Sequence, residues 1–569
     1  MEASRLEGDA VAFALGGSGG LWRRSSGALG TWAGLAVIGL LIALPLRGLY
    51  VFTGGTMEEG FMLYFPERVA LGDVPNVDFL HLYGPGSLQA LFGWFEVFGY
   101  SLRAERTFGL IQHLGIILGL FALARPWGRL VATFVGALAV FYVLTPVALT
   151  AMAWNGGLAL TLWGTVFAVR GIYLEGAGRG YAWLAAGALY GLALTFRPDL
   201  IVAIGLVVGW MIWRYRPIWR ALAIGGAVGL IPMWVHLAMA GPGPAIRGML
   251  LDPVFELRAG RELPRPPSWS SLDGSLQVIA ETVPPFWPFP SLSASHTLFF
   301  WFWLMLLTPF GLLGVAVWRR RRSGPTGPST ALLVTALVSI GVLPQGLQRP
   351  DSAHLLWVTC VSFPFVVVAV VELVGHRRPA LSARRVVLIG GAAALALTFV
   401  FTSLFTFRYW LLHVRVGLEQ VNTPFLVRRD DRVFYLGDYR AHLAVQAAVD
   451  EVDRRAAPGD RLLVGPSDLS RTWYSDVFIY WFFPELEPAT YYIEMDPGLA
   501  NAEGSSLADD VASADFVLLT GLWDGWTEPN TSAEHGSQAP NEVIAEQFCE
   551  IGRWEDGLAM LYERCDRLG

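Results

Sequence analysis

The chain has 569 residues, of which 54% are apolar and only 15% are charged. A typical globular protein carries roughly 25% charged residues, so this composition excludes a disordered chain or a nucleic-acid-binding protein and is typical of an integral membrane protein. The net charge of −6 hides an asymmetry, because residues 409–569 contain 28 acidic and 12 basic residues. The sequence therefore predicts an apolar, basic membrane part, residues 31–408, followed by an acidic, water-soluble part, residues 409–569.

Apolar segments close to the 20 residues that cross a bilayer recur along the membrane part. Eleven segments are predicted to span the membrane: 31–53, 103–124, 129–149, 154–173, 181–196, 199–213, 221–240, 296–318, 330–347, 353–374 and 386–408. The fifth and sixth meet at Arg197-Pro198-Asp199, which interrupts an otherwise continuous apolar run. Run 86–100 is too short to span and contains Glu96, so it is predicted to be an interfacial helix.

The positions of the arginines predict the orientation of these spans, because cytoplasmic connections are enriched in basic residues. With residues 1–30 in the cytoplasm, the arginine-rich connections, among them Arg319–Arg322, all fall on the cytoplasmic side. The opposite side then holds a first outer loop, residues 54–102, a long proline-rich loop, residues 241–294, and the acidic tail. We therefore expect a multi-pass protein of a bacterial cell membrane, with its C-terminal domain outside the cytoplasm and the long loop covering a cavity.

The acidic tail has the pattern of a small α/β domain. Its apolar spacing predicts a helix over 440–457 and strands at 461–465, 489–493, 515–521 and 558–564. No glycine-rich phosphate-binding loop opens any of these units, so nucleotide binding is not predicted. Cys549 and Cys565 lie 16 residues apart outside the cytoplasm and are expected to form a disulfide; the alternative is two small buried thiols.

The first outer loop carries several ionisable side chains close to the membrane. It contains the carboxylates Glu58, Glu59 and Asp78, with His81 and Tyr83 beside them. A solvated loop without a function would have the same composition. Ionisable groups at membrane depth are costly and usually face polar cavities. A functional cavity is favoured because further ionisable groups are predicted on the same side of the membrane as this loop. These groups are Arg47, Arg197, Asp199, Arg349, Asp351 and His354.

Residues 58–86 resemble the first loop of the GT-C polytopic membrane glycosyltransferases, which include protein mannosyltransferases and aminoarabinose transferases. That loop typically reads Asp-Glu, then Gly-x-x-Tyr-x-Asp, then a Pro-Pro-Leu turn. Here Glu58-Glu59 stands at the acidic pair, Gly72–Asp78 at the second element and Gly84-Pro85-Gly86 at the turn. The first acid is Glu instead of Asp, and one Pro remains at the turn. The resemblance covers about residues 31–215 and implies a polytopic α-helical fold with an appended domain.

The resemblance also implies an inverting transferase that uses a polyprenyl-phosphate sugar as donor. Its acceptor would be a glycan, lipid or protein of the cell envelope, and membrane lipids would surround it. Such a transfer needs a carboxylate that accepts the acceptor's proton and cations that hold the leaving phosphate. Glu58 is the first candidate base, with Glu59 and Asp78 as alternatives. Guanidinium groups offer paired donors to phosphate, and the candidate phosphate ligands are Arg47, Arg197 and Arg349.

Other interpretations remain open for several of these residues. The remaining candidates for the substrate cavity are His81, Tyr83, Asp199, Asp351 and His354. The alternative role of Arg47 is that of an interfacial anchor, and the alternative role of Asp199 is that of an ion-pair partner that only neutralises Arg197. The histidines could hold a divalent cation with the acids, but no clustered metal motif supports this, so no cofactor is assigned. A transporter or flippase would have matching broken helices in its two halves, and a non-catalytic envelope scaffold is the third alternative.

Overall fold

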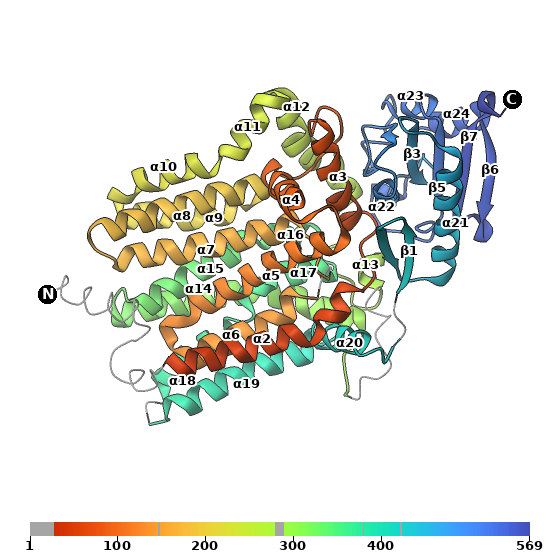
Figure 1. Cartoon of the computed structure of the whole chain (residues 1–569). Helices are drawn as coiled ribbons and strands as arrows, with labels where there is room; N and C mark the ends of the chain where they lie inside the picture. Colours follow the sequence, from red (N-terminus) through yellow and green to blue (C-terminus); the bar gives the residue numbers. More distant parts are fainter. Residues whose placement is uncertain (1–27, 146–147, 279–288, 379, 422–423, 569) are drawn as a thin grey trace.

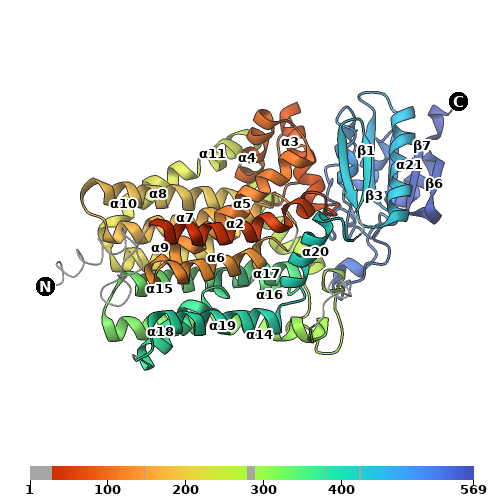
Figure 2. The same cartoon turned by 60° about the horizontal axis from the view of Figure 1, so that its bottom comes forward.

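The protein, described by a computed structural model over residues 28–145, 148–278, 289–378, 380–421 and 424–568, consists of a helical bundle and a C-terminal part that contains the strands (Figure 1). The C-terminal part lies at one end of the bundle in both views (Figures 1 and 2). Most of the N-terminal segment that the sequence assigns to the cytoplasm, residues 1–27, lies outside the described residues.

Apolar helices of different lengths form the bundle. They are α2 (Ala28–Tyr50), α5 (Leu102–Ala124), α6 (Arg129–Val143), α7 (Ala153–Tyr173), α8 (Gly176–Phe196), α9 (Ile201–Arg214), α10 (Trp219–Gly229), α11 (Ile231–Ala240), α14 (Ala294–Ser323), α15 (Gly327–Gly341), α16 (Leu343–Gln348), α17 (Ser352–Ser362), α18 (Val366–Arg377) and α19 (Ala383–Phe401). Among the described residues, six helices, some of them joined across a short break, are long and apolar enough to cross a membrane, and α10 with α11, bent by 47°, would make a seventh. The chain is thus a multi-pass membrane protein. Each of the eleven predicted segments contains a helix, and the count of eleven crossings stays a prediction.

Two helix breaks at the end of the bundle that faces the C-terminal part have the same sequence, Arg-Pro-Asp. The interruption predicted at Arg197-Pro198-Asp199 is confirmed, because α8 ends at Phe196 and Arg197 has extended backbone. Arg349 is also extended and follows the end of α16. A residue before proline is disfavoured in the helical conformation, which accounts for both breaks. Asp351 then caps α17 by accepting a hydrogen bond from the backbone N–H of His354 (3.0 Å).

The first outer loop is mostly helical, which the sequence analysis had not predicted for its first half. Helix α3 (Glu58–Leu71) begins at the acidic pair, where carboxylates favour a helix N-terminus. Helix α4 (Pro85–Phe98) confirms the helix predicted over 86–100, and its place at the membrane interface stays a prediction. Helix α3 lies against the C-terminal part so closely that a Cβ at Gly60 would stand 2.3 Å from the backbone nitrogen of Phe478. The absence of a side chain at Gly60 therefore permits this packing.

The C-terminal part is an α/β domain, as predicted. Its elements are β1 (Phe425–Arg429), β2 (Arg432–Leu436), α21 (Tyr439–Arg455), β3 (Arg461–Pro466), α22 (Phe478–Trp481), β4 (Glu487–Pro488), α23 (Leu507–Ala512), β5 (Phe516–Thr520), α24 (Ala539–Gln547), β6 (Phe548–Trp554) and β7 (Ala559–Arg564). Strands β1 and β2 form a hairpin, and the other five form a sheet in the order β4-β3-β5-β7-β6. Strand β3 is parallel to β4 and β5, and β7 is antiparallel to its neighbours. A disulfide joins Cys549 to Cys565, the pair expected to be bridged.

One predicted strand of this domain is wrong. Residues 489–493 are not part of a strand. The N–H of Ala489 still donates to the carbonyl of Leu462 in β3 (2.9 Å), but the residues after it bond elsewhere. The carbonyl of Tyr491 accepts a hydrogen bond from the N–H of Leu80 in the first outer loop (2.9 Å). The hydroxyl of Thr490 donates to Asp510 (2.7 Å). This segment therefore connects the domain to the bundle instead of extending the sheet.

Two other segments complete the contact between bundle and domain. The boundary predicted at residue 409 falls inside helix α20 (Phe407–Gly417), which packs against α2. The long loop 241–294 contains α12 (Pro242–Ile246), a π-helical stretch, Arg247–Glu256, and α13 (Ser275–Val278). It touches both parts: the N–H of Leu263 donates to the carbonyl of Gln348 (3.2 Å), and Gly260 packs against Pro497. Residues 279–288 of this loop lie outside the described residues.

Candidate functional site

A cluster of ionisable side chains lies where the bundle meets the C-terminal domain, near α3, α16 and α17 in Figure 1. We call it the polar cluster. The bundle and its loops supply Glu58, Tyr83, Arg197, Asp199, Arg261, Arg349, Asp351 and His354, and the C-terminal domain supplies Tyr474, Glu494, Asp496 and Glu528. Hydrogen bonds, ion pairs and ring contacts, described below, join most of these residues in three groups. Two tyrosines connect the groups electrostatically: Tyr83 interacts with Glu58, Arg197 and Arg261, and Tyr474 interacts with Glu58, Arg261 and Arg349. The structure thus brings together side chains from widely separated parts of the chain.

The two adjacent acids at the start of α3 have different environments. Glu59 is fully buried, and both of its oxygens accept hydrogen bonds from Arg106, whose Nε and Nη2 atoms lie 2.7 Å away. Glu58 is only partly buried and faces the C-terminal domain, where the hydroxyl of Tyr474 donates to its Oε1 atom (3.1 Å). Successive residues of a helix point about 100° apart, which explains the separation. Of the pair, only Glu58 belongs to the polar cluster.

The first Arg-Pro-Asp break places Arg197 at the side of the cluster nearest α7. Its Nε and Nη2 atoms each donate to one oxygen of Asp199, both at 2.9 Å. The guanidinium also lies over the rings of Tyr83 and Trp154, at 5.2 and 5.4 Å from their centroids. Asp199 in turn accepts a hydrogen bond from Gln345. Arg197 is therefore oriented by a carboxylate and two aromatic faces.

The second break places Arg349 between the bundle and the C-terminal domain. Its Nε atom donates to Asp351 (2.8 Å), and its Nη1 and Nη2 atoms donate to the two oxygens of Glu528, the former at 2.9 Å. The Nη1 atom also donates to the carbonyl of Arg261 (2.8 Å). Asp351 accepts a further hydrogen bond from Nδ1 of His354 (2.9 Å). Arg349 thus connects a bundle carboxylate, the long loop and a carboxylate of the C-terminal domain.

The C-terminal domain contributes two buried carboxylates, Glu494 and Asp496. Asp496 pairs with Arg261 of the long loop. One oxygen of each carboxylate is buried without a hydrogen-bond partner among the described residues. Burial and the neighbouring Asp496 raise the pKa of Glu494 well above its ordinary value. Burial, with Glu58 and other acids nearby, also raises the pKa of the Tyr474 hydroxyl, so this hydroxyl stays protonated and can donate to Glu58.

Several predicted site residues lie apart from the cluster or at its edge. Arg47 is exposed near the end of α2 and pairs with Glu419. Asp78 is exposed and accepts a hydrogen bond from the N–H of Val74 within its own turn (2.7 Å). His81 is buried, and its ring packs edge-on against the ring of Tyr83 (5.8 Å). In the part of the chain that the structure describes, no hydrogen bond or ion pair joins Arg47 or Asp78 to the cluster.

Five members of the cluster had no signal in the sequence analysis: Arg261, Tyr474, Glu494, Asp496 and Glu528. Arg261 lies in the long loop that was expected to cover a cavity. This expectation was the only feature of the sequence analysis that connected Arg261 with a functional site. The others belong to a domain with many acidic residues, so composition could not single them out. Over the described ranges, no group of three or more His, Cys, Asp or Glu side chains is arranged to hold a metal ion.

Comparison with known proteins gives similarity at the level of the fold. The chain matches no protein-family model and no curated protein. The crystal structure of ArnT from Cupriavidus metallidurans bound to undecaprenyl phosphate aligns with a TM-score of 0.53 and 13% sequence identity, over 94% of this chain and 98% of that one. The apo form of the same protein gives a TM-score of 0.52 and 14% identity, over 95% and 99% of the two chains. Because the similarity extends over nearly the whole of both chains, the protein described here shares the fold of ArnT, in agreement with the GT-C-like fold expected from residues 58–86.

Proposed function

We propose that the protein is an inverting glycosyltransferase that moves a sugar from a polyprenyl-phosphate donor to an acceptor of the cell envelope. In this proposal the reaction takes place at the polar cluster, on the extracytoplasmic side of the membrane. The observation that carries the proposal is the position of Glu58, partly exposed and oriented by Tyr474, in one cluster with Arg197 and Arg261. The crystal structure of ArnT with undecaprenyl phosphate supports the choice of donor, because the two folds correspond along most of their length.

In the proposed reaction, an oxygen of Glu58 accepts the proton of the acceptor's nucleophilic group as that group attacks the anomeric carbon of the sugar. The bond between this carbon and the donor phosphate breaks, and the polyprenyl phosphate leaves with the bonding electrons. A single displacement of this kind inverts the configuration at the anomeric carbon. Since Tyr474 donates to Oε1 of Glu58, the Oε2 atom is the one we assign to the proton transfer.

Arg197 is the proposed ligand of the donor phosphate. Two of its nitrogens are bound by Asp199, and among the described residues no hydrogen bond involves its Nη1 atom, so N–H groups remain to interact with phosphate as negative charge develops. Arg349 uses all three of its nitrogens to bind Asp351, Glu528 and a carbonyl group, so we propose that it positions the C-terminal domain. For Arg47, its exposed ion pair favours the role of interfacial anchor.

The test is transfer of radiolabel from a polyprenyl-phosphate sugar to a detergent-solubilised envelope extract. Glu58→Gln should lower turnover by about 10²- to 10⁴-fold, the usual effect of losing a general base, while donor binding stays nearly unchanged. Arg197→Gln should weaken donor binding and turnover together, because a phosphate ligand acts in both the ground state and the transition state.

The matched control is Glu96→Gln, which removes an exposed carboxylate from α4 in the same outer loop. Its turnover should equal that of the unchanged protein. Glu59→Gln is unsuitable as a control, because it breaks a buried ion pair. Normal turnover in Glu58→Gln would exclude Glu58 as the base, and normal turnover in both Glu58→Gln and Arg197→Gln would refute the proposed site.

A further inference from the structure

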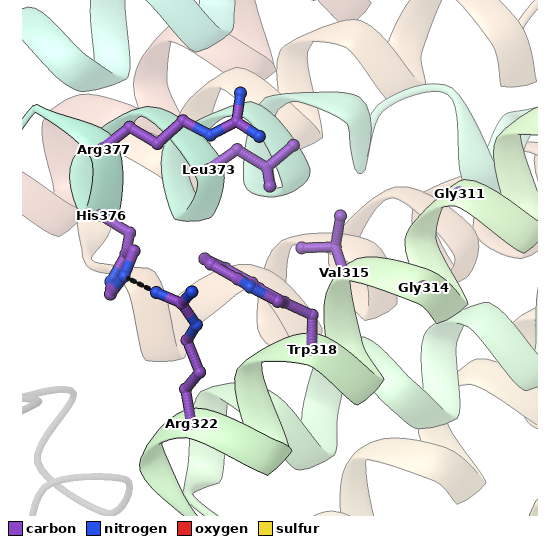
Figure 3. Close-up of a pocket in the computed structure, with 8 residues that line it drawn as sticks. All are labelled: Gly311, Gly314, Val315, Trp318, Arg322, Leu373, His376 and Arg377. Atoms are coloured by element: carbon purple, nitrogen blue, oxygen red, sulfur yellow. Dashed lines mark hydrogen bonds between the residues drawn. The ribbon is translucent and has the colours of Figure 1, made fainter.

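The end of the bundle away from the C-terminal domain contains a cavity between α14 and α18 that the proposed reaction does not use. Its volume is about 380 Å³. Figure 3 shows its lining: α14 supplies Gly311, Gly314, Val315, Trp318 and Arg322, and α18 supplies Leu373, His376 and Arg377. The two glycines lie toward one end of the cavity, and Arg322 and His376 lie toward the other. The cavity therefore has a cationic, aromatic end and an apolar end.

The cationic end has an excess of positive charge. Arg322 lies over the ring of Trp318, 5.2 Å from its centroid, and its Nη1 atom donates to Nε2 of His376. Among the described residues, neither Arg322 nor Arg377 forms an ion pair with a carboxylate. The acid on α18, Glu372, is bound instead by Trp127 and Arg319, at 2.6 and 3.3 Å. The guanidinium groups of Arg322 and Arg377 are thus available to an anion.

The apolar end forms a shallow channel along α14. Gly311 and Gly314 are exposed, and a Cβ built on either would have no atom within 4 Å, so the space beside this face of the helix is open. Val315 and Leu373 border it with aliphatic side chains. Helix α14 is one of those long and apolar enough to cross a membrane. A hydrocarbon chain that follows this face would extend from the arginines toward the middle of the bilayer.

We propose that this cavity binds an anionic phospholipid. Its phosphate would be held by Arg322 and Arg377, and one acyl chain would lie against Gly311 and Gly314. Basic pockets between membrane helices are suited to anionic headgroups, because guanidinium groups bind phosphate oxygens in pairs. A zwitterionic lipid would bring an ammonium group toward the same cations, so it binds less well. The adjoining apolar channel favours a lipid over free phosphate, because free phosphate has no apolar group that could occupy the channel.

The first test measures binding of phosphatidylglycerol to the full-length protein in neutral detergent by native mass spectrometry. Arg322→Gln and Arg377→Gln should each weaken binding about fivefold, and the double variant about 30-fold. The matched control removes two exposed arginines at the start of α19, Arg384 and Arg385, which do not line the cavity; its affinity should change less than twofold. Equal binding of phosphatidylethanolamine, equal loss in the control, or displacement of the lipid by millimolar inorganic phosphate would overturn the proposal.

The second test fills the channel without changing the charge. Gly314→Leu places a side chain in open space, so the fold accommodates it, and phosphatidylglycerol binding should fall about tenfold. Gly205→Leu adds the same bulk to an exposed face of α9, where a Cβ also meets no atom within 4 Å, and binding should be unchanged. Unaltered lipid binding in Gly314→Leu would refute the acyl-chain position and, with it, a lipid as the occupant.

Discussion

Replacing Glu59 by glutamine should destabilise the protein strongly although the two side chains have nearly the same shape. Glu59 and Arg106 are both 0% exposed, and two hydrogen bonds of 2.7 Å join them. The Nη1 atom of Arg106 also donates to the carbonyl of Tyr50 (2.9 Å), so the guanidinium connects the end of α2 with the starts of α3 and α5. Glutamine would remove the carboxylate that binds the Nε and Nη2 atoms of Arg106, so that only the electrostatic interaction with the buried Glu105 remains. It would also turn an amide N–H₂ toward the N–H groups of Arg106.

The magnitude follows from the burial of the pair. Removing one partner of a buried ion pair typically costs about 3–5 kcal/mol, a large part of the roughly 5–15 kcal/mol that stabilises a typical folded protein. We expect this loss in the free energy of unfolding, measured by urea titration in detergent with tryptophan fluorescence. Arg106→Gln should cost a similar amount. The double variant should lose about 3 kcal/mol less than the sum of the single variants, because the pair is removed only once.

The control for this experiment is Glu96→Gln, an exposed change that should alter stability by no more than about 0.5 kcal/mol. A loss below about 1 kcal/mol in Glu59→Gln would refute the reasoning, since it would mean that the two hydrogen bonds from Arg106 to Glu59 contribute little to stability. Additive effects of the two single variants would also refute it, because they would mean that Glu59 and Arg106 stabilise the fold independently.

Three further predictions concern the C-terminal domain and the orientation of the chain. The raised pKa of Glu494 means that the folded domain keeps a proton that the unfolded chain releases above its ordinary pKa of 4.5. The free energy of unfolding should therefore fall as pH rises above 4.5. Thermal unfolding measured from pH 5 to 8 should show this fall, and Glu494→Gln should make it less steep. Thiol labelling of the denatured, unreduced protein should detect Cys360 alone, and Cys549→Ser should lower the free energy of unfolding by about 3 kcal/mol, the value for a loop of this length; three labelled thiols would contradict the bridge. Alkaline phosphatase fused after α20 should be active and fused after α14 inactive, and the reverse pattern would show that the orientation is wrong.

The sequence predicts those features of the fold that depend on local physics. The break at Arg197 could be predicted because Pro198 follows it. Proline disfavours the helical conformation of the preceding residue in any structural context. Apolar length identifies the helical segments, and alternating or continuous apolar runs identify β3, β5 and β7. The same local pattern misleads at residues 489–493, whose composition suits a strand but whose backbone binds Leu80 of a distant loop.

The candidate site depends on contacts that no local pattern contains. Glu58 and Glu59 are identical in type and adjacent, and they differ because Tyr474 of the C-terminal domain binds the first and Arg106 of α5 binds the second. Arg349 is as plausible a phosphate ligand as Arg197 in the sequence. The structure distinguishes them through Glu528, which follows Arg349 by 179 residues. Such long-range pairs appear only once the domain is placed against the bundle.

The dependence of the polar cluster on the C-terminal domain has a consequence for biosynthesis. The membrane helices up to α19 are translated and inserted before the ribosome reaches Tyr474 and Glu528. A nascent chain at that stage contains Arg261 without Asp496, and Arg349 with Asp351 but without Glu528. It also contains Glu58 without the hydroxyl that orients it. The cluster is complete only after translation has finished and the last domain has docked. A prematurely terminated chain can thus insert its membrane helices while its cluster remains incomplete.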